Sequence, residues 1–183
     1  MPPFKHYPKV FPNTNLFYKI LEEVTFNQDT FFNNGTWCKE LRGTSWMSDD
    51  LSTTLEYSEK VMNPSYLSPT ISYIRNHLLD IFKIYFDSVL VNYYPNGKSG
   101  MRFHSDPLAN KWDTNFVIVS FGSTRKLVFR KINDYQIKHY IQFEDGDCVH
   151  MFDKCQDLYQ HCIKKDKHLD NPRVSLVFKR LKT

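Results

Sequence analysis

The sequence predicts a mainly β protein of the α+β class, a β-sandwich or jelly roll backed by helices near the N-terminus. The first observation is length, because 183 residues suffice for one sizeable domain and are few for two. The second is composition, since 15 Phe and 11 Tyr against 6 Gly favour broad β-surfaces over a glycine-rich nucleotide-binding fold. The third is a run of short alternating segments from residue 88 onward, separated by turn-forming residues.

Two helices are predicted in the first half of the chain. Residues 16–24 place apolar side chains on one helical face, with Asn13, Thr14 or Asn15 as the cap. Ser68 and Pro69 then form a start signal for a second helix, as N-cap and first helical residue. Its buried stripe is expected at Ile71, Ile74, Leu78 and Ile81. Residues 33–66 are aromatic but too broken by Gly, Asn, Ser, Asp and Pro for a regular element.

Eight strands are predicted in the second half. Their sequences, in chain order, are SVLVNYY, MRFHSD, FVIVSFG, KLVFRK, IKHYIQF, DCVHMF, YQHCI and RVSLVFK. Turn residues lie between them, as at Pro95-Asn96-Gly97 and Asp145-Gly146-Asp147. The chain contains no repeat or linker, which favours a single domain over residues 1–183.

The charge balance is mildly basic, with a formal net charge of +4 and a pI near 8.8. Most basic clusters lie in the second half. A balance of this kind is typical of a soluble protein, and also of one that binds a polyanion such as nucleic acid.

Cysteine usage and hydropathy indicate the cellular setting. The four cysteines show no C-x-x-C pair and no zinc-finger spacing, so free thiols in a reducing compartment are expected. The N-terminus carries prolines where a secretion signal has an apolar core, and no apolar run is long enough to span a bilayer. These features predict a soluble intracellular protein without distinguishing nucleus from cytoplasm.

His104 and Asp106 are spaced i and i+2 in a predicted strand, so both side chains point to one face. His161 lies in another predicted strand downstream. Two histidines and one carboxylate form the facial triad of non-haem Fe(II) oxygenases, which leaves coordination positions open. Taken alone, an H-x-D sequence is usually structural, and a lone histidine is usually a core or surface residue.

The last predicted strand offers an anion anchor by the same alternation. Arg173, Ser175 and Lys179 share one face, and a buried Arg173 would need an anion, which a dicarboxylate would satisfy with bidentate geometry. Asn92 and Tyr94 share a face of the first strand and offer an amide and a phenol. Each of these residues is unremarkable by itself. Their order along the chain, with the required alternation in each strand, favours one site.

Four sequence blocks, covering residues 88–180, resemble the AlkB family of Fe(II)- and 2-oxoglutarate-dependent dioxygenases. The blocks are NYYPNGKSGMRFHSD, SFGSTRKLVFR, DGDCVHMFDKCQDLYQH and RVSLVFK. The resemblance implies a double-stranded β-helix, with residues 88–183 as its catalytic core. It also implies that residues 1–87 hold the N-terminal helices and a nucleotide-recognition lid.

The resemblance further implies roles for individual residues. His104, Asp106 and His161 would bind Fe(II), which reacts with 2-oxoglutarate and O2. The cosubstrate residues would be Asn92, Tyr94, Arg173, Ser175 and Lys179. In the lid, Arg42 and Tyr57 resemble substrate-binding positions, and Arg125 and Arg130 are expected to contact phosphates. The ordinary alternative is that the lid rings pack over the sheet and that these arginines are solvated.

The sequence departs from the family pattern at three places. Lys179 stands where a second arginine is usual. The positive charge is kept, but the planar guanidinium that binds a carboxylate with two hydrogen bonds is lost. Val177 replaces a common threonine, and Pro107 with Leu108 replaces acidic residues that help to select the base. Substrate choice is therefore the part of the resemblance that the sequence supports least.

The resemblance implies the reaction of the family, so we expect a monomeric enzyme that demethylates N-alkylated bases in DNA, with release of formaldehyde, succinate and CO2. One alternative keeps the iron chemistry and changes the substrate to RNA, tRNA or a protein side chain. A second alternative is an AlkB-like module that binds nucleic acid without turnover. The replacement of the usual second arginine by Lys179 is the observation that favours it.

Overall fold

The computed structural model describes residues 1–12, 15–33, 35–57 and 60–182. It contains three helices in this range, α1 (Leu16–Glu23), α2 (Pro69–Phe82) and α3 (Cys155–Leu158). The strands before α2 are β1 (Phe4–Tyr7), β2 (Thr30–Asn33), β3 (Thr36–Lys39), β4 (Gly43–Ser48), β5 (Leu55–Tyr57) and β6 (Lys60–Met62). Those after it are β7 (Ser88–Tyr94), β8 (Met101–His104), β9 (Phe116–Gly122), β10 (Arg125–Lys131), β11 (Lys138–Phe143), β12 (Cys148–Met151), β13 (Tyr159–Ile163) and β14 (Arg173–Lys179).

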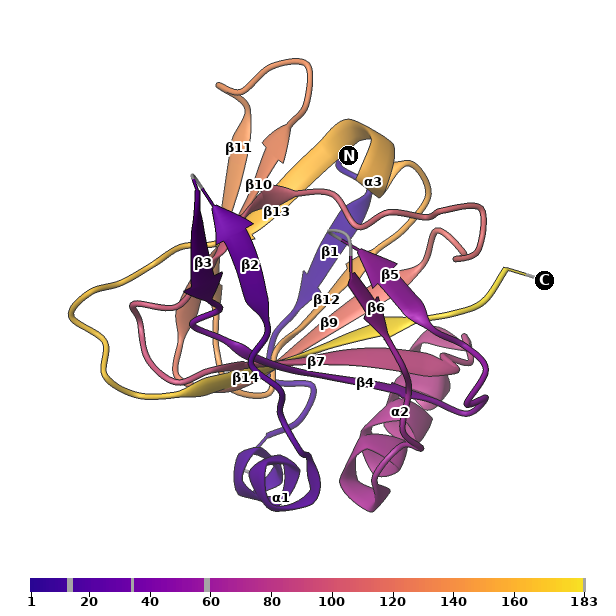
Figure 1. Ribbon diagram of the computed structural model, residues 1–183. Coiled ribbons are helices and arrows are strands. Elements are labelled where there is room, and N and C mark those ends of the chain that lie inside the picture. The colour runs from indigo at the N-terminus through magenta and orange to yellow at the C-terminus, as the bar shows by residue number, and fades with distance from the viewer. Residues whose placement is uncertain (13–14, 34, 58–59, 183) are drawn as a thin grey trace.

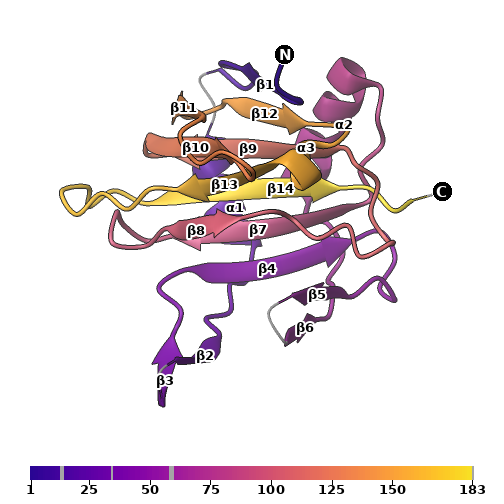
Figure 2. The same ribbon diagram turned by 90° about the horizontal axis from the view of Figure 1, so that it is seen from above.

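Two antiparallel sheets face each other and form a double-stranded β-helix, which confirms the predicted fold class. The larger sheet has six strands in the order β1-β12-β9-β14-β7-β4, and the smaller has four in the order β11-β10-β13-β8. Figure 1 shows α1 and α2 beneath the six-stranded sheet, and Figure 2, seen from above, shows the four-stranded sheet lying over the six-stranded one. One apolar cluster lies between the sheets, and a second joins the six-stranded sheet to the two helices.

The prediction for residues 33–66 was wrong, because this stretch contains a strand of the main sheet. β4 pairs with β7 over its whole length, and all six of its residues are buried. Its sequence, GTSWMS, is mostly small and polar, so it lacks the alternation that marks a half-exposed strand. β1 also joins this sheet through β12. The core sheet therefore takes two edge strands from residues 1–87.

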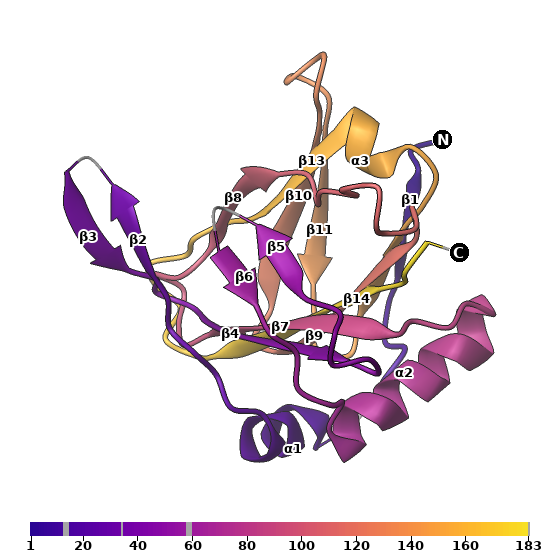
Figure 3. The same ribbon diagram turned by 45° about the vertical axis from the view of Figure 1, so that its right-hand side comes forward.

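Two hairpins extend beyond β4, as Figure 3 shows. The first pairs β2 with β3, and the second pairs β5 with β6. The segments that lead to and from them are bridged to β4, Asn27 to Thr44 and Ser65 to Met47. These bridges cover much of the free edge of β4, which would otherwise be a site for unwanted strand pairing.

The helix start at Ser68 agrees with the prediction, since its hydroxyl accepts a hydrogen bond from the Ile71 amide at 3.4 Å. The stripe along α2 is buried at Ile71, Ile74 and Leu78, whereas Ile81 is 40% exposed near the end of the helix. For α1, Asn15 is the N-cap without a side-chain bond, and Asn13 and Thr14 lie outside the described residues.

Glu23 ties the end of α1 to the start of α2. Its carboxylate accepts hydrogen bonds from the Thr70 amide at 2.9 Å and from the Thr70 hydroxyl at 2.6 Å. Burial favours the neutral acid, but bonds from Ser68 and Thr70 outweigh it and lower the pKa of Glu23 below its ordinary value of 4.5. A carboxylate at a helix N-terminus is also favoured by the helix dipole.

We expect Glu23→Gln to lower the free energy of unfolding at pH 7 by about 1 kcal/mol, because it removes the charged cap. Because the folded state lowers the pKa of Glu23, the ionised carboxylate stabilises the fold when the pH is above the ordinary pKa of this group. That stabilisation is lost as the pH falls below the ordinary pKa. In urea denaturation, the difference between wild type and variant should therefore shrink as the pH falls below 4.5. Glu22→Gln, on an exposed position of the same helix, is the control. An equal loss in both variants would contradict the cap.

All four cysteines are free thiols, as expected, with Cys38 half-buried and the other three buried. Over the described part of the chain, no helix combines the length and apolar character needed to cross a membrane.

Candidate metal centre and cosubstrate site

The two sheets bring His104, Asp106 and His161 together in the cavity between them. β8 and β13 are neighbours, and His104 lies directly opposite His161 in their register. One ligand atom from each of the three residues lies within 4.8 Å of the others. β8 ends at His104, so Asp106 comes from the loop that follows and not from the strand that the alternation argument assumed. The three side chains still converge on one point.

Hydrogen bonds to the backbone orient these side chains. The Nδ1 atom of His104 bonds to the Arg102 carbonyl at 2.8 Å, which leaves Nε2 to face a metal. In the next loop, the Ser105 hydroxyl donates to the Tyr159 carbonyl at 3.0 Å. The Asp106 amide donates to the side chain of Gln156 at 2.8 Å. Gln156 is a buried residue of α3 that the sequence did not single out.

The electrostatics of the triad favour the forms that bind a metal. Burial is the main cause that lowers the pKa of His161, to about 3, so its imidazole is neutral at physiological pH. Burial alone would raise the pKa of Asp106, but the charge of Lys179 and its hydrogen bond hold that pKa well below its ordinary value. A neutral imidazole and an ionised carboxylate are the forms that coordinate metal. One carboxylate oxygen of Asp106 has no hydrogen-bond partner among the described residues.

Lys179 contacts the metal-binding carboxylate. Its ammonium lies 3.4 Å from Asp106 and 4.1 Å from the ring centre of Phe116, and the residue is 2% exposed. Burial lowers the pKa of Lys179, and the charge of Asp106 opposes this effect. The residue that departs from the family pattern is therefore placed beside the metal ligand.

Arg173 is a fully buried cation with unused donors. Its Nε atom donates to the Ser120 hydroxyl at 2.8 Å. Among the described residues, neither terminal nitrogen has a partner with hydrogen-bond geometry, although the Tyr94 ring lies close. Burial lowers its pKa to about 10, so the guanidinium remains charged at neutral pH. A buried charge of this kind is costly unless an anion pairs with it. The two free nitrogens fit one carboxylate of 2-oxoglutarate.

Of the other predicted cosubstrate residues, Asn92, Tyr94 and Ser175 lie beside Arg173 on the same inner face, whereas Lys179 lies beside Asp106 at the other end of β14. Tyr94 is opposite Arg173 across β7 and β14, and Asn92 is opposite Ser175. Asn92, Tyr94 and Ser175 line one cavity together with all three triad residues. The structure therefore joins the two predicted ligand sets in one site.

The predicted substrate residues do not all lie together. Arg42 lines this cavity and donates to the Asn92 side chain at 3.0 Å. Arg125 is 2% exposed and donates to the carbonyls of Ser99 and Lys164, so it braces loops and presents no free face to a phosphate. Arg130 lies on the outer face of the smaller sheet, bound to Gln160 at 2.7 Å. The side chain of Tyr57 lies outside the described residues.

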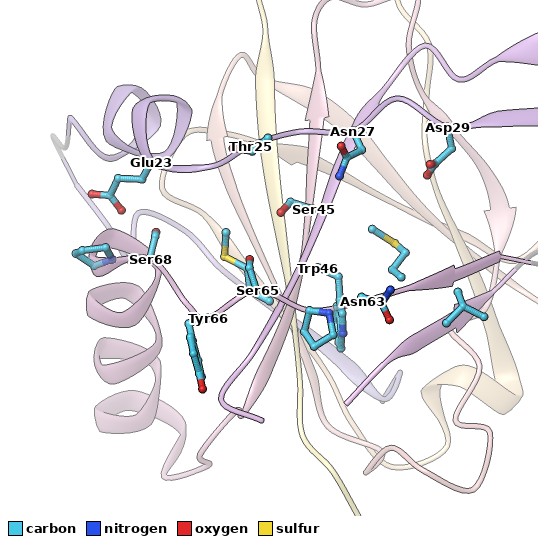
Figure 4. Close-up of a pocket in the computed structure, with 15 residues that line it drawn as sticks. Glu23, Thr25, Asn27, Asp29, Ser45, Trp46, Asn63, Ser65, Tyr66 and Ser68 are labelled. Carbon is cyan, nitrogen blue, oxygen red and sulfur yellow. The ribbon is translucent and has the colours of Figure 1, made fainter. Parts of the chain in front are cut away.

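A second cavity, of about 780 Å³, lies beside β4, between the segment that leads into β2 and the segment that follows β5. Figure 4 shows Asn27 and Asp29 on one side of it and Asn63 and Ser65 on the other. Its described lining contains no Lys, Arg or His and no member of the triad. Trp46 passes beneath it as a core residue, 2% exposed, with its indole N–H donating to the Thr53 carbonyl. This ring is therefore part of the core.

A double-stranded β-helix that encloses two histidines and one carboxylate defines the non-haem iron oxygenases. The chain belongs to the 2OG-Fe(II) oxygenase superfamily, whose family model matches residues 5–179. It is thus an Fe(II)- and 2-oxoglutarate-dependent oxygenase, and His104, Asp106 and His161 are its iron triad.

Individual relatives give further detail. The chain is 30% identical to uncharacterized protein R406 of Acanthamoeba polyphaga mimivirus over 98% of this chain and 94% of that one. It is 25% and 26% identical to alpha-ketoglutarate-dependent dioxygenase alkB homolog 3 of Bos taurus and Homo sapiens, over 90% and 88% of this chain. It spans 60% and 59% of the length of these two relatives. A solved structure, OsALKBH1, superposes with a TM-score of 0.70 at 15% identity and covers 98% of this chain and 97% of its own, which supports the fold.

Proposed function

We propose that this oxygenase demethylates N-alkylated bases in DNA and so reverses alkylation damage directly. The observation that carries the proposal is the cavity between the sheets, which is lined by the triad and Arg42, with the unpaired nitrogens of the buried Arg173 next to Tyr94 of its lining. The relatives named alkB homolog 3 support this reaction class at low identity.

In this proposal, Arg173 binds one carboxylate of 2-oxoglutarate, while Asn92, Tyr94 and Ser175 orient the molecule from the same inner face. Lys179 stays with Asp106 and keeps that ligand ionised and in place. Iron held by the triad would supply the oxygen chemistry: one atom of O2 would enter succinate as 2-oxoglutarate loses CO2, the other would hydroxylate an N-methyl group, and the hydroxymethyl product would release formaldehyde to restore the base. A base must leave its stack to reach this enclosed site. Arg42, in the cavity, is placed to meet it.

The test is a side-by-side assay of formaldehyde release from methylated single-stranded DNA, duplex DNA, RNA and a methylated peptide. We expect release from DNA to exceed release from the peptide at least tenfold, and uncoupled 2-oxoglutarate turnover to be low when DNA is present. A preference for RNA would show that the substrate is RNA and not DNA, while the demethylation reaction would stand. Preference for the peptide, or turnover of 2-oxoglutarate without release from any nucleic acid, would refute the proposal.

A further inference from the structure

The outer face of the four-stranded sheet is the broad face of the β-helix opposite the helical layer. Side chains of β10, β11 and β13 alternate, and Leu127, Phe129, Phe143 and Ile163 point into the core between the sheets. The alternate residues therefore point outward. Figure 1 shows both long helices on the other sheet. Among the described residues, this outer face is thus formed by strand side chains and is open to solvent over much of its area.

Several outward positions are basic. Lys126 on β10, Lys138 on β11 and Lys164, directly after β13, are exposed, and none of β8, β10, β11 and β13 contains Asp or Glu. Arg130 lies opposite Lys138 in the register of β10 and β11. Lys126 lies beside Lys164, whose amide donates to the Lys126 carbonyl at 3.0 Å. Like charges opposite each other destabilise a sheet. Two such pairs on one face indicate a surface arranged for an anionic partner.

Aromatic rings lie between these charges. The Arg130 guanidinium is stacked between Phe103 and Tyr135, with ring centres 4.0 and 4.1 Å away. Tyr140 is 61% exposed at an outward position next to Val128. Alternating cations and exposed rings on a sheet are typical of surfaces that bind single-stranded nucleic acid, because bases stack on the rings while phosphates contact the cations.

The face is continuous with the iron site through β8. The register between β8 and β13 shifts between the His104–His161 and Met101–Ile163 pairs. Phe103 contacts the outward Arg130 and Arg102 is exposed, while His104 belongs to the triad. A strand of nucleic acid with one base at the iron would leave the cavity beside this edge. The four strands then offer a width of about 14 Å, enough for a few unpaired nucleotides.

We propose that a basic face formed by Arg102, Lys126, Arg130, Lys138, Tyr140 and Lys164 binds the single-stranded nucleic acid that flanks the base at the iron. The inference deepens the proposed function, and rests on it only for the identity of the molecule in the cavity. Single strands are favoured over duplex because stacking on Tyr140 needs an unpaired base.

The first test measures binding of an unmodified 20-nucleotide DNA by fluorescence anisotropy. The triple variant Lys126→Gln, Lys138→Gln, Lys164→Gln is compared with Lys5→Gln, Lys19→Gln, Lys182→Gln, which removes the same charge from exposed positions elsewhere. We expect the first variant to weaken binding more than tenfold and to reduce the salt slope by about 2, since each lost phosphate contact contributes about 0.7. The control should stay within threefold. Equal weakening in both, or binding to phosphatidylserine vesicles but not to DNA, would overturn the proposal.

The second test separates stacking from charge and binding from catalysis. Tyr140→Ala should weaken binding about tenfold and Tyr140→Phe less than twofold, because the ring and not the hydroxyl stacks. In demethylation assays, the triple variant should raise KM for a methylated 20-mer and leave a methylated trinucleotide unaffected. An unchanged KM for the 20-mer would overturn the proposal that the basic face binds the flanking nucleic acid, and would leave the proposed reaction standing. Failure to demethylate any nucleic acid, with binding still lost in the triple variant, would overturn only the proposed reaction.

Discussion

Asp106→Ala is expected to abolish iron binding and 2-oxoglutarate turnover, with a loss of at least about 100-fold. Even residues that only support metal ligands cost 10–100-fold when replaced, and Asp106 is itself a ligand. Asp106 carries the negative charge next to His161 and Lys179. Without it, an Fe(II) ion would lie near the positive charge of Lys179 with no carboxylate to compensate. Iron content of the purified protein and succinate formation are the two measurements.

The controls separate metal loss from unfolding. Asp106→Asn keeps the shape of the side chain and removes its charge, so it should lose iron while retaining the wild-type circular dichroism spectrum. Asp134→Ala, in an exposed turn between β10 and β11, should keep full activity. An Asp106→Ala protein that retained both iron and turnover would rule out the facial triad.

The sequence predicted the site well because its geometry is mostly local. Alternation along a strand placed Arg173 with Ser175, and Asn92 with Tyr94, before any contact was known, and the register of β7 and β14 pairs the two sets. The alternation argument also predicted that Asp106 lies near His104. This is correct, although β8 ends at His104 and Asp106 belongs to the loop that follows. The loop that replaces the strand is held by Gln156 from α3, a contact 50 residues away that no local pattern encodes.

The remaining errors have a common physical cause, which is tertiary burial of polar sequence. β4 reads as a polar stretch, yet both of its faces are covered. Arg125 reads as a surface cation, but loops from elsewhere in the chain supply the carbonyls that bury it. Arg130 has a similar sequence context but lies on the outer face of the sheet, where its partners are Gln160 on the neighbouring β13 and the ring of Phe103 on β8. Propensity cannot distinguish two such arginines, since only their partners differ.

Arg173→Met is expected to stabilise the protein without cosubstrate while eliminating its response to 2-oxoglutarate. Methionine fills much of the same volume and removes a buried charge whose terminal nitrogens are unpaired among the described residues. Replacing a buried ion by a hydrophobic residue of similar size is often neutral or stabilising by 1–4 kcal/mol. Wild-type protein should instead gain about 2.7 kcal/mol in the free energy of unfolding at 2-oxoglutarate concentrations 100 times the Kd. Urea denaturation with and without 2-oxoglutarate measures both effects.

The two expected changes have opposite signs, and this makes the experiment decisive for the anchor. A residue that only supported the fold would lose stability on replacement, and the response to 2-oxoglutarate would survive. Arg173→Lys keeps the charge without the fork, so a partial response is expected with a raised KM for 2-oxoglutarate. Arg180→Met, one residue past the strand on a partly exposed position, should leave the response intact. If Arg173→Met kept the full stabilisation by 2-oxoglutarate, the carboxylate would have to bind elsewhere, and the unpaired nitrogens of Arg173 would need another anion.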